Sequence, residues 1–257
     1  MYADDVQFLD TDSPANIQDL KNRVESNLSL AMKWFTQNRL KINPSKTEMI
    51  IIKSSRQVTD TSFSAHFGND KISQSHSVKV LGVVVDHHLT WDKHVTAVVQ
   101  RCNMILVGLA RMRNRVPKST KRMLIEALVF PHIRYCISVW GGCSATQKKR
   151  IQKTINFGAR IVCGLSRREH VTPALQELGW GRVDDLIRDS DLTIVRNLLS
   201  APNSSEILRS KLILRSDESA RCTRATERGQ LQLPRVKTEF ARNSFLFRAS
   251  KHWNISS

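Results

Sequence analysis

Two adjacent aspartates, Asp4 and Asp5, follow Tyr2 and Ala3 at the start of the sequence, with the apolar run 6–9 directly behind them. An acidic pair beside short strand-like stretches predicts a tight hairpin that carries both carboxylates at its tip. Neighbouring side chains of a flat strand point to opposite faces, so both acids reach one metal site only if the backbone turns between them, which Asp tolerates. Carboxylates suit Mg²⁺, and two such ions about 3.5–4 Å apart stabilise the attacking and leaving oxygens of phosphoryl transfer. The pair therefore predicts two-metal catalysis.

Further motifs follow this pair in order: Trp34 with residues 38–48, the stretch 81–91, Arg134-Tyr135-Cys136 with Trp140, and Ser244-Phe245 with Trp253-Asn254. Together with Tyr-Ala-Asp-Asp, they resemble the reverse transcriptases of non-LTR, LINE-type retrotransposons of the jockey kind. The resemblance runs from that motif through nearly the whole chain. It implies that Asp4 and Asp5 are catalytic metal ligands and that Lys46 is a candidate general acid, which gives a proton to departing pyrophosphate. It also implies that Leu81 and Gly82 belong to a primer grip.

The resemblance also implies parts that this sequence lacks. In the family, a further catalytic aspartate comes from a strand well before Tyr-Ala-Asp-Asp and the fingers also lie upstream, whereas Met1 alone stands there in this chain. We therefore expect a C-terminal fragment of an RNA-directed DNA polymerase, which adds deoxynucleotides to a primer 3′-hydroxyl and is inactive on its own. Its partners would be an RNA template, a DNA primer or their hybrid, and deoxynucleoside triphosphates. The alternative is a non-catalytic nucleic-acid-binding remnant of a decayed retrotransposon.

Several side chains have a second interpretation. Lys46 is equally well explained as a surface lysine that caps a turn. Asp86 ends a β-branched run and could replace the lost carboxylate as a metal ligand, but closing a turn ahead of a helix is the favoured explanation. Because no Cys or carboxylate stands at matching helical spacing, surface positions are favoured over metal ligation for three histidines: His87, His88 and His94.

Positive charge is concentrated in one part of the chain. Residues 100–168 carry 15 Lys and Arg against 1 Asp or Glu, whereas residues 1–99 carry 11 of each and residues 169–257 carry 14 against 11. A solvated helical face normally mixes signs, so this surplus favours a polyanion, and nucleic acid is the natural partner. The expected nucleic-acid-binding residues are Arg111, Arg113, Arg115, Lys148, Lys149, Arg150 and Lys153.

Composition fits a basic globular protein. The chain has 257 residues, 40% of them hydrophobic, which is enough for one large domain or two small ones. No apolar run approaches the length of a membrane span and no signal-peptide pattern opens the sequence, so we expect an intracellular protein of the cytoplasm or nucleus without membrane contact. The five cysteines are odd in number and never spaced Cys-x-x-Cys, which indicates reduced thiols.

Hydrophobic periodicity predicts an α+β fold whose first part, residues 1–91, is a partial palm. A helix is expected after Ser13-Pro14, with its apolar face packed inward and its end near Asn38. Strands are expected at 40–42 and 47–53, followed by a small hairpin that turns at residues 68–70. The β-branched run 78–85, broken only by a glycine, predicts one more strand.

The remaining sequence predicts helices. Residues 92–168 are expected to form a basic thumb of three helices, which begin near Asp92, Val116-Pro117 and Thr146. Residues 169–257 are expected to form a helical C-terminal region. Beyond Ala201 the apolar periodicity weakens, which predicts a basic, weakly structured tail that a few aromatic residues could anchor: Phe240, Phe245, Phe247 and Trp253.

Overall fold

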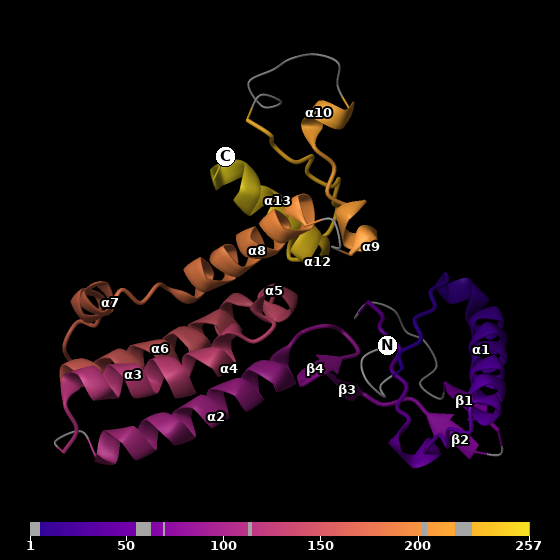
Figure 1. The fold of residues 1–257 in the computed structure, drawn as a ribbon, viewed down its shortest axis with the longest axis horizontal. Coiled ribbons are helices and arrows are strands. Elements are labelled where there is room, and N and C mark those ends of the chain that lie inside the picture. The colour runs from indigo at the N-terminus through magenta and orange to yellow at the C-terminus, as the bar shows by residue number, and fades with distance from the viewer. Residues whose placement is uncertain are drawn as a thin grey trace. The chain divides into compact units, whose positions relative to one another are not determined.

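The computed structural model describes residues 6–54, 63–68, 70–112, 115–201, 205–218 and 228–256. The chain forms two compact units, residues 1–90 and 91–257 (Figure 1). Helices and two small antiparallel sheets make up the described part, which is compatible with the predicted α+β class. The predicted thumb and the predicted C-terminal region both lie within the second unit. Every described helix is too short or too polar to span a bilayer.

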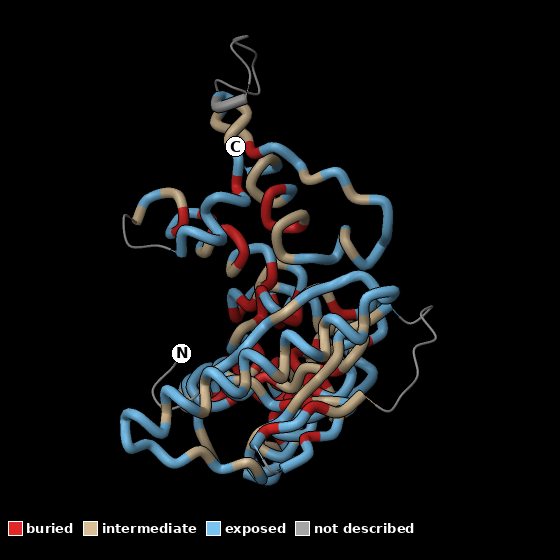
Figure 2. Tube along the Cα trace, turned by 90° about the vertical axis from the view of Figure 1, so that its right-hand side faces the viewer, coloured by how far each residue is buried: buried red, intermediate tan, exposed pale blue. Residues whose placement is uncertain are grey.

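The first unit begins with the short 3₁₀ helix η1 (Pro14–Asn16) and α1 (Ile17–Gln37), which ends at Asn38 as predicted. The helix lies beside β1 (Ser64–Phe67). The predicted apolar stripe is the less exposed face of α1, because all of its residues are half-buried, but no residue of the helix is fully buried. Figure 2 shows the helix without a buried position.

Two hairpins follow. The first pairs β1 with β2 (Asp70–Ser73) and turns where predicted. The second pairs β3 (Ser77–Val80) with β4 (Val83–Asp86), so the run predicted as one strand is a hairpin. Its two-residue turn consists of Leu81 and Gly82, with φ of 45° and 87°. Positive φ at both positions gives the twist that suits a tight hairpin, and glycine adopts it without strain.

The predicted strands at 40–42 and 47–53 are not strands in the structure. The 3₁₀ helix η2 (Pro44–Lys46) separates them, and the second stretch is extended without a continuous ladder. It makes separate backbone hydrogen bonds, from Ser75 N–H to the Met49 carbonyl (2.8 Å) and from Lys53 N–H to the His87 carbonyl (3.0 Å). β propensity was therefore present, but pairing was not continuous.

The second unit is helical. Its main helices are α2 (Asp92–Arg111), α3 (Lys118–Leu128), α6 (Ala145–Cys163), α7 (Thr172–Leu178) and α8 (Val183–Ser200). The first three begin within two residues of the predicted positions. Two short helices, α4 (Phe130–Arg134) and α5 (Ile137–Trp140), lie between α3 and α6. α2 packs along α6, and α3 packs against both. This arrangement places the apolar faces of all three helices in one core.

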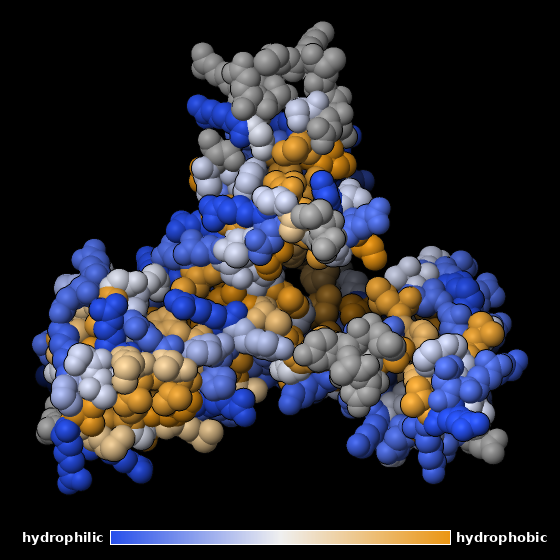
Figure 3. Space-filling model, in the orientation of Figure 1, coloured by the Kyte–Doolittle hydropathy of each residue, from blue (hydrophilic) through white to orange (hydrophobic). Residues whose placement is uncertain are grey.

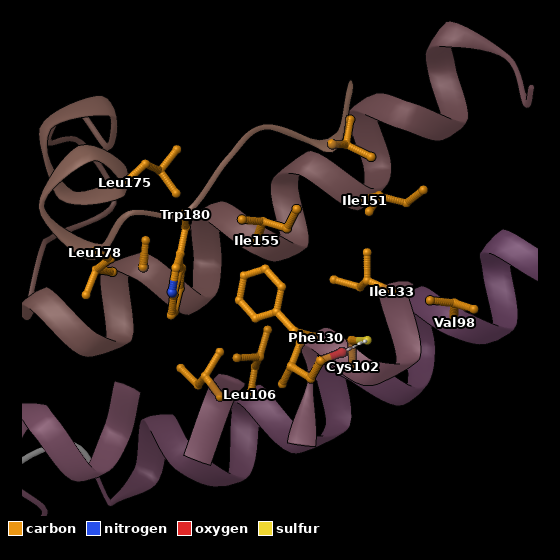
Figure 4. Close-up of a cluster of buried hydrophobic side chains, with 14 of the residues drawn as sticks. Val98, Cys102, Leu106, Phe130, Ile133, Ile151, Ile155, Leu175, Leu178 and Trp180 are labelled. Carbon is orange, nitrogen blue, oxygen red and sulfur yellow. Dashed lines mark hydrogen bonds between the residues drawn. The ribbon is translucent and has the colours of Figure 1, made fainter. Parts of the chain in front are cut away.

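The core of this bundle is continuous from α2 to α8. Figure 4 shows Leu106, Phe130 and Ile155 directed toward one another from α2, α4 and α6, with the Trp180 ring beside them. The rings of Phe130 and Trp180 meet edge to face at 4.9 Å. Burying each large apolar side chain contributes about 1.5–3 kcal/mol, so this cluster determines the positions of the helices.

The prediction of a weakly structured tail is wrong for much of the segment. Among the residues described there are α9 (Glu206–Arg209), α10 (Arg215–Glu218), α12 (Glu239–Arg242) and α13 (Phe245–Ser256). α13 packs against α8 around a second apolar cluster that contains Val195, Leu198, Leu231 and Ala249. Phe245 and Trp253 pack against this cluster as predicted, whereas Phe240 is 59% exposed. Sparse apolar residues were sufficient because α8 offers a complementary face.

Candidate nucleic-acid interface

α6 carries the densest group of predicted contacts. Its N-terminus is capped by the Ser144 hydroxyl, which accepts a hydrogen bond from Gln147 N–H (3.3 Å). Its C-terminus ends at Gly164, whose φ of 68° is the left-handed conformation that glycine adopts easily. One face is buried in the bundle core through Ile151, Ile155 and neighbouring residues. The opposite face is therefore directed to solvent.

The solvent face of α6 is cationic. Lys149 and Lys153 are exposed and lie one turn apart, and Arg160 follows at the same helical phase with intermediate exposure. The helix contains no Asp or Glu. We call Lys149, Lys153 and Arg160 the α6 ridge. Because α-helices rise about 1.5 Å per residue, the ridge spans about 16 Å along one line.

Two further cations flank the ridge and are held by neighbouring helices. Lys148 Nζ lies 3.0 Å from Asp184 Oδ1 of α8. Arg150 Nη1 donates to Thr96 Oγ1 of α2 (2.9 Å) and to Gln147 Oε1 (2.8 Å). Both side chains therefore contribute to helix packing, and the charge of Lys148 is partly compensated. The two exposed lysines of the ridge are therefore more accessible to an anion than Lys148 and Arg150.

Sequence reasoning missed Arg160. Its distance from Lys153 is seven residues, two helical turns, so the spacing alone placed it on the same face. Its guanidinium donates to the Ser166 carbonyl, which directs it along the end of the helix. Hydrogen bonds from Ser166 lower the pKa of the Glu169 carboxyl group, and Arg160 lies close enough for its guanidinium to help lower it.

The arginines at the end of α2 form a separate group. Arg111 is the last residue of α2 and Arg115 follows the helix; both are exposed, and Arg113 lies outside the described residues. Beside them, α2 also exposes apolar side chains, with Met104 71% and Val107 43% exposed. Figure 3 shows apolar surface over α2 and α3 at the lower left. This surface therefore presents cations beside exposed apolar side chains.

Glu126 is the single acid of residues 100–168, and its charge is already matched. Its Oε1 accepts from Trp180 Nε1 and from Arg122 Nε, both at 2.9 Å. These two hydrogen bonds hold the pKa of Glu126 below its usual value. The carboxylate stays ionised near neutral pH and is satisfied within the bundle, so it does not oppose an anion at the α6 ridge.

The predicted catalytic residues are tested less directly. Asp4 and Asp5 lie outside the described residues, so the structure offers no geometry for the predicted Mg²⁺ site. Across the part of the chain that is described, no group of three or more His, Cys, Asp or Glu residues could hold a metal ion. Lys46 is exposed at the end of η2, a turn that the Asn43 side chain caps by accepting from Ser45 N–H (3.1 Å). Its role as general acid stays a prediction.

Leu81 and Gly82 form the exposed tip of the β3–β4 hairpin. A primer grip there stays a prediction. Asp86 closes the turn before α2, which was the favoured explanation. Its Oδ1 accepts from the backbone N–H groups of His88 (3.1 Å) and Thr90 (3.0 Å). With its side chain occupied in this way, Asp86 is a turn residue.

The histidines differ from one another. The ring nitrogens Nδ1 of His87 and His88 lie 3.1 and 2.9 Å from the carbonyls of His76 and Lys53. His94 is 4% exposed, so its predicted surface position is wrong; it lies beside the Trp140 ring at 5.5 Å. Burial lowers the pKa of His94 and favours the neutral ring. The four described cysteines are free thiols, as predicted.

Comparison with known proteins gives three related sequences, all RNA-directed DNA polymerases of Drosophila mobile elements. The probable enzyme of the transposon X-element of Drosophila melanogaster is 26% identical over 171 residues, 63% of this chain and 18% of that protein. That of the transposon BS of the same species is 28% identical over 168 residues, again 63% and 18%. The enzyme of the mobile element jockey of Drosophila funebris is 23% identical over 210 residues, 79% and 22%.

The predicted resemblance to non-LTR reverse transcriptases is confirmed. The chain spans about a fifth of the length of these reverse transcriptases. No protein-family model matches it, and no solved structure matches it either. The similarity to these polymerases thus rests on sequence, and the division into palm and thumb stays a prediction.

Proposed function

We propose that the chain is the C-terminal part of an RNA-directed DNA polymerase and that its second unit holds a nucleic-acid duplex by its phosphates. The observation that carries this proposal is the α6 ridge, a line of cations on a helix without acids. Phosphate contacts fix a protein on a duplex without reading its sequence. The RNA template and DNA primer of the related polymerases would form that duplex, so we expect little sequence preference.

In the complete enzyme, Asp4 and Asp5 would bind two Mg²⁺ ions that activate the primer 3′-hydroxyl and stabilise the leaving pyrophosphate. Two carboxylates supply about two negative charges to ions that carry four, and each Mg²⁺ requires six well-placed oxygens. Water and substrate phosphates fill some positions but do not replace a fixed carboxylate that bridges both ions. The further aspartate that the resemblance implies would therefore come from another segment of the polymerase.

A direct test compares binding of the chain to RNA–DNA hybrids of equal length and unrelated sequence, measured by fluorescence anisotropy. We expect similar affinities for the hybrids and a steep decrease with salt. Failure to bind any hybrid at low salt would refute the proposal. Binding without primer extension, even after the upstream region is supplied, would instead favour the non-catalytic remnant, because the α6 ridge is complete without Asp4 and Asp5.

A further inference from the structure

The connection between α5 and α6 is enclosed by two other parts of the second unit. Residues 141–144 link the helices, and a Cβ atom on Gly142 would lie 2.2 Å from the Asn243 carbonyl oxygen. A Cβ on Gly141 would lie 3.0 Å from Ile187 Cγ2 of α8. Glycine at both positions therefore permits a close approach by α8 on one side and by the segment before α13 on the other. The start of α6 is fitted between them.

A buried arginine joins the same three parts. Arg248 of α13 forms a two-pronged ion pair with Asp191 of α8, with Nε–Oδ2 at 2.8 Å and Nη2–Oδ1 at 3.1 Å. Its Nη2 also donates to the Ser138 carbonyl of α5 (2.7 Å), and its Nη1 donates to the Asn243 carbonyl (2.9 Å). The two charged side chains are only 9% and 0% exposed. All three guanidinium nitrogens are thus engaged inside the protein.

We propose that Arg248 is a positioning residue for the nucleic-acid interface, because its guanidinium ties α13 to α5 and α8 and so determines where α6 begins. The expected effect on nucleic-acid affinity rests on the proposed function, whereas the contacts of Arg248 do not. Ser138 and Ser144, the N-cap of α6, are six residues apart, and Lys149 is the fifth residue of the helix. A shift of the α5 end is therefore transmitted to the α6 ridge through a short connector with little free space.

Arginine is specifically suited to this position. Its planar fork reaches a carboxylate and two carbonyls at once, whereas a lysine ammonium is a point charge that reaches fewer partners in a fixed geometry. Without the guanidinium, Asp191 would keep a hydrogen-bond partner in His252, whose Nδ1 lies 3.1 Å from Oδ2. Removing one member of a buried ion pair raises the fraction of molecules in which the region around it is locally unfolded by about a hundredfold or more.

The test uses the full chain with Arg248→Ala, Arg248→Lys and, as a control of equal charge change, Arg242→Ala on exposed α12. Two measurements are made: amide hydrogen exchange of the first turns of α6, and affinity for an RNA–DNA hybrid as a function of salt. Millimolar guanidinium is then added to Arg248→Ala, with tetramethylammonium at the same concentration as the ionic-strength control. A guanidinium ion can occupy the vacated site, whereas tetramethylammonium cannot donate hydrogen bonds.

We expect Arg248→Ala to increase exchange in the first turns of α6 about a hundredfold, the change for a lost buried partner, and to lower hybrid affinity. Guanidinium, but not tetramethylammonium, restores both values. Arg248→Lys lies between the parent and Arg248→Ala, and Arg242→Ala matches the parent in exchange. If Arg248→Ala does not fold, Arg248→Lys carries the same comparison.

If Arg248→Ala releases α13 but leaves amide exchange in α6 unchanged, the proposal is overturned. Arg248 would then anchor α13 without positioning the interface. A loss of affinity that guanidinium leaves unchanged would also overturn the proposal. If the parent chain binds no hybrid, the proposed function fails, and exchange in α6 alone decides whether Arg248 positions that helix.

Discussion

Replacing the two exposed lysines of the α6 ridge, in a Lys149→Ala/Lys153→Ala variant, tests the interface most directly. Each phosphate contact on a duplex contributes about −0.9 to the slope of log K against log salt. The sequence alone predicts about four contacts, from Arg113, Lys148, Lys149 and Lys153, and hence a slope near −3.6. Two of these four contacts are the exposed ridge lysines, so we expect them to supply about half of the slope.

The double variant should therefore lose about 1.8 from the slope. Between 50 and 200 mM salt, this corresponds to about a tenfold smaller change in affinity than the parent shows. Lys148→Ala should alter the slope less than Lys149→Ala, because its ammonium must leave Asp184 to reach a phosphate. The assay is a salt titration by fluorescence anisotropy on one RNA–DNA hybrid, with all variants at one pH.

A matched control removes the same charge elsewhere in the second unit. Arg196 of α8 and Lys251 of α13 are both exposed, and the variant Arg196→Ala/Lys251→Ala should keep the slope of the parent. Equal slopes for the ridge variant and the parent would refute the assignment of α6 as the phosphate-binding helix. An equal loss in both double variants would show that affinity follows net charge and not the ridge.

Four further outcomes are expected. Primer-extension assays with Mg²⁺ should give no product from this chain and product once the upstream region is supplied, which Asp4→Asn should abolish; template-dependent extension by this chain alone would contradict this. Asp86→Ala should lower the free energy of unfolding by about 1–2 kcal/mol, because two backbone N–H groups lose their hydrogen-bond partner. This should appear as faster amide exchange in β3 and β4, and unchanged exchange would exclude the turn role. Burial raises the pKa of Asp191, but hydrogen bonds from His252 and Arg248 outweigh it and leave the pKa lowered. Anchoring of α13 should therefore be complete above the unfolded value of about 3.9 and be lost as pH falls from there through the lower folded-state pKa; amide exchange in α13 measures this, and an equal acid response in Asp191→Asn would contradict it. Gly142→Ala should lower the free energy of unfolding by about 1–3 kcal/mol through overpacking, whereas Gly108→Ala, with no atom within 4 Å of the new Cβ, should not; equal denaturant midpoints would refute the close approach.

The main helices of the second unit were predictable because local signals agreed. α2, α3 and α6 have apolar residues at helical spacing, and α6 and α7 end at glycines in the left-handed conformation. Asp86 was predicted correctly for a similar reason, since its hydrogen-bond partners are two and four residues away. Each of these features depends on a short segment of chain.

The failures depend on contacts between distant residues or on unusual turn chemistry. Nothing local distinguishes Leu81 as a turn residue, because its φ of 45° is imposed by the pairing of β3 with β4. Residues 47–53 have strand composition but gain only separate hydrogen bonds, since propensity depends on what lies alongside. The apolar face of α1 was identified correctly as a stripe, but its burial requires a surface that the described residues do not supply.

The candidate site shows the same division in its charges. Composition located the surplus cations in residues 100–168 but did not indicate which of them are accessible to a partner. Packing separates them, because Lys148 and Arg150 contact neighbouring helices while Lys149 and Lys153 are exposed. Only the three-dimensional structure could make this distinction, since Asp184 and Thr96 lie 36 and 54 residues away from their partners.

The geometry of the ridge also bears on the kind of partner. An acidic protein surface presents a few charges at irregular positions, and on a surface of mixed sign attraction and repulsion largely cancel. A nucleic-acid strand carries one charge about every 3.4 Å along a line, so several phosphates lie within the roughly 16 Å that the ridge spans. A rigid row of cations gains from such a partner only if the helix keeps its direction. The Arg248 contacts to α5 and α8 constrain the end of the bundle from which α6 starts, so affinity for a linear polyanion should depend on a residue that does not touch it.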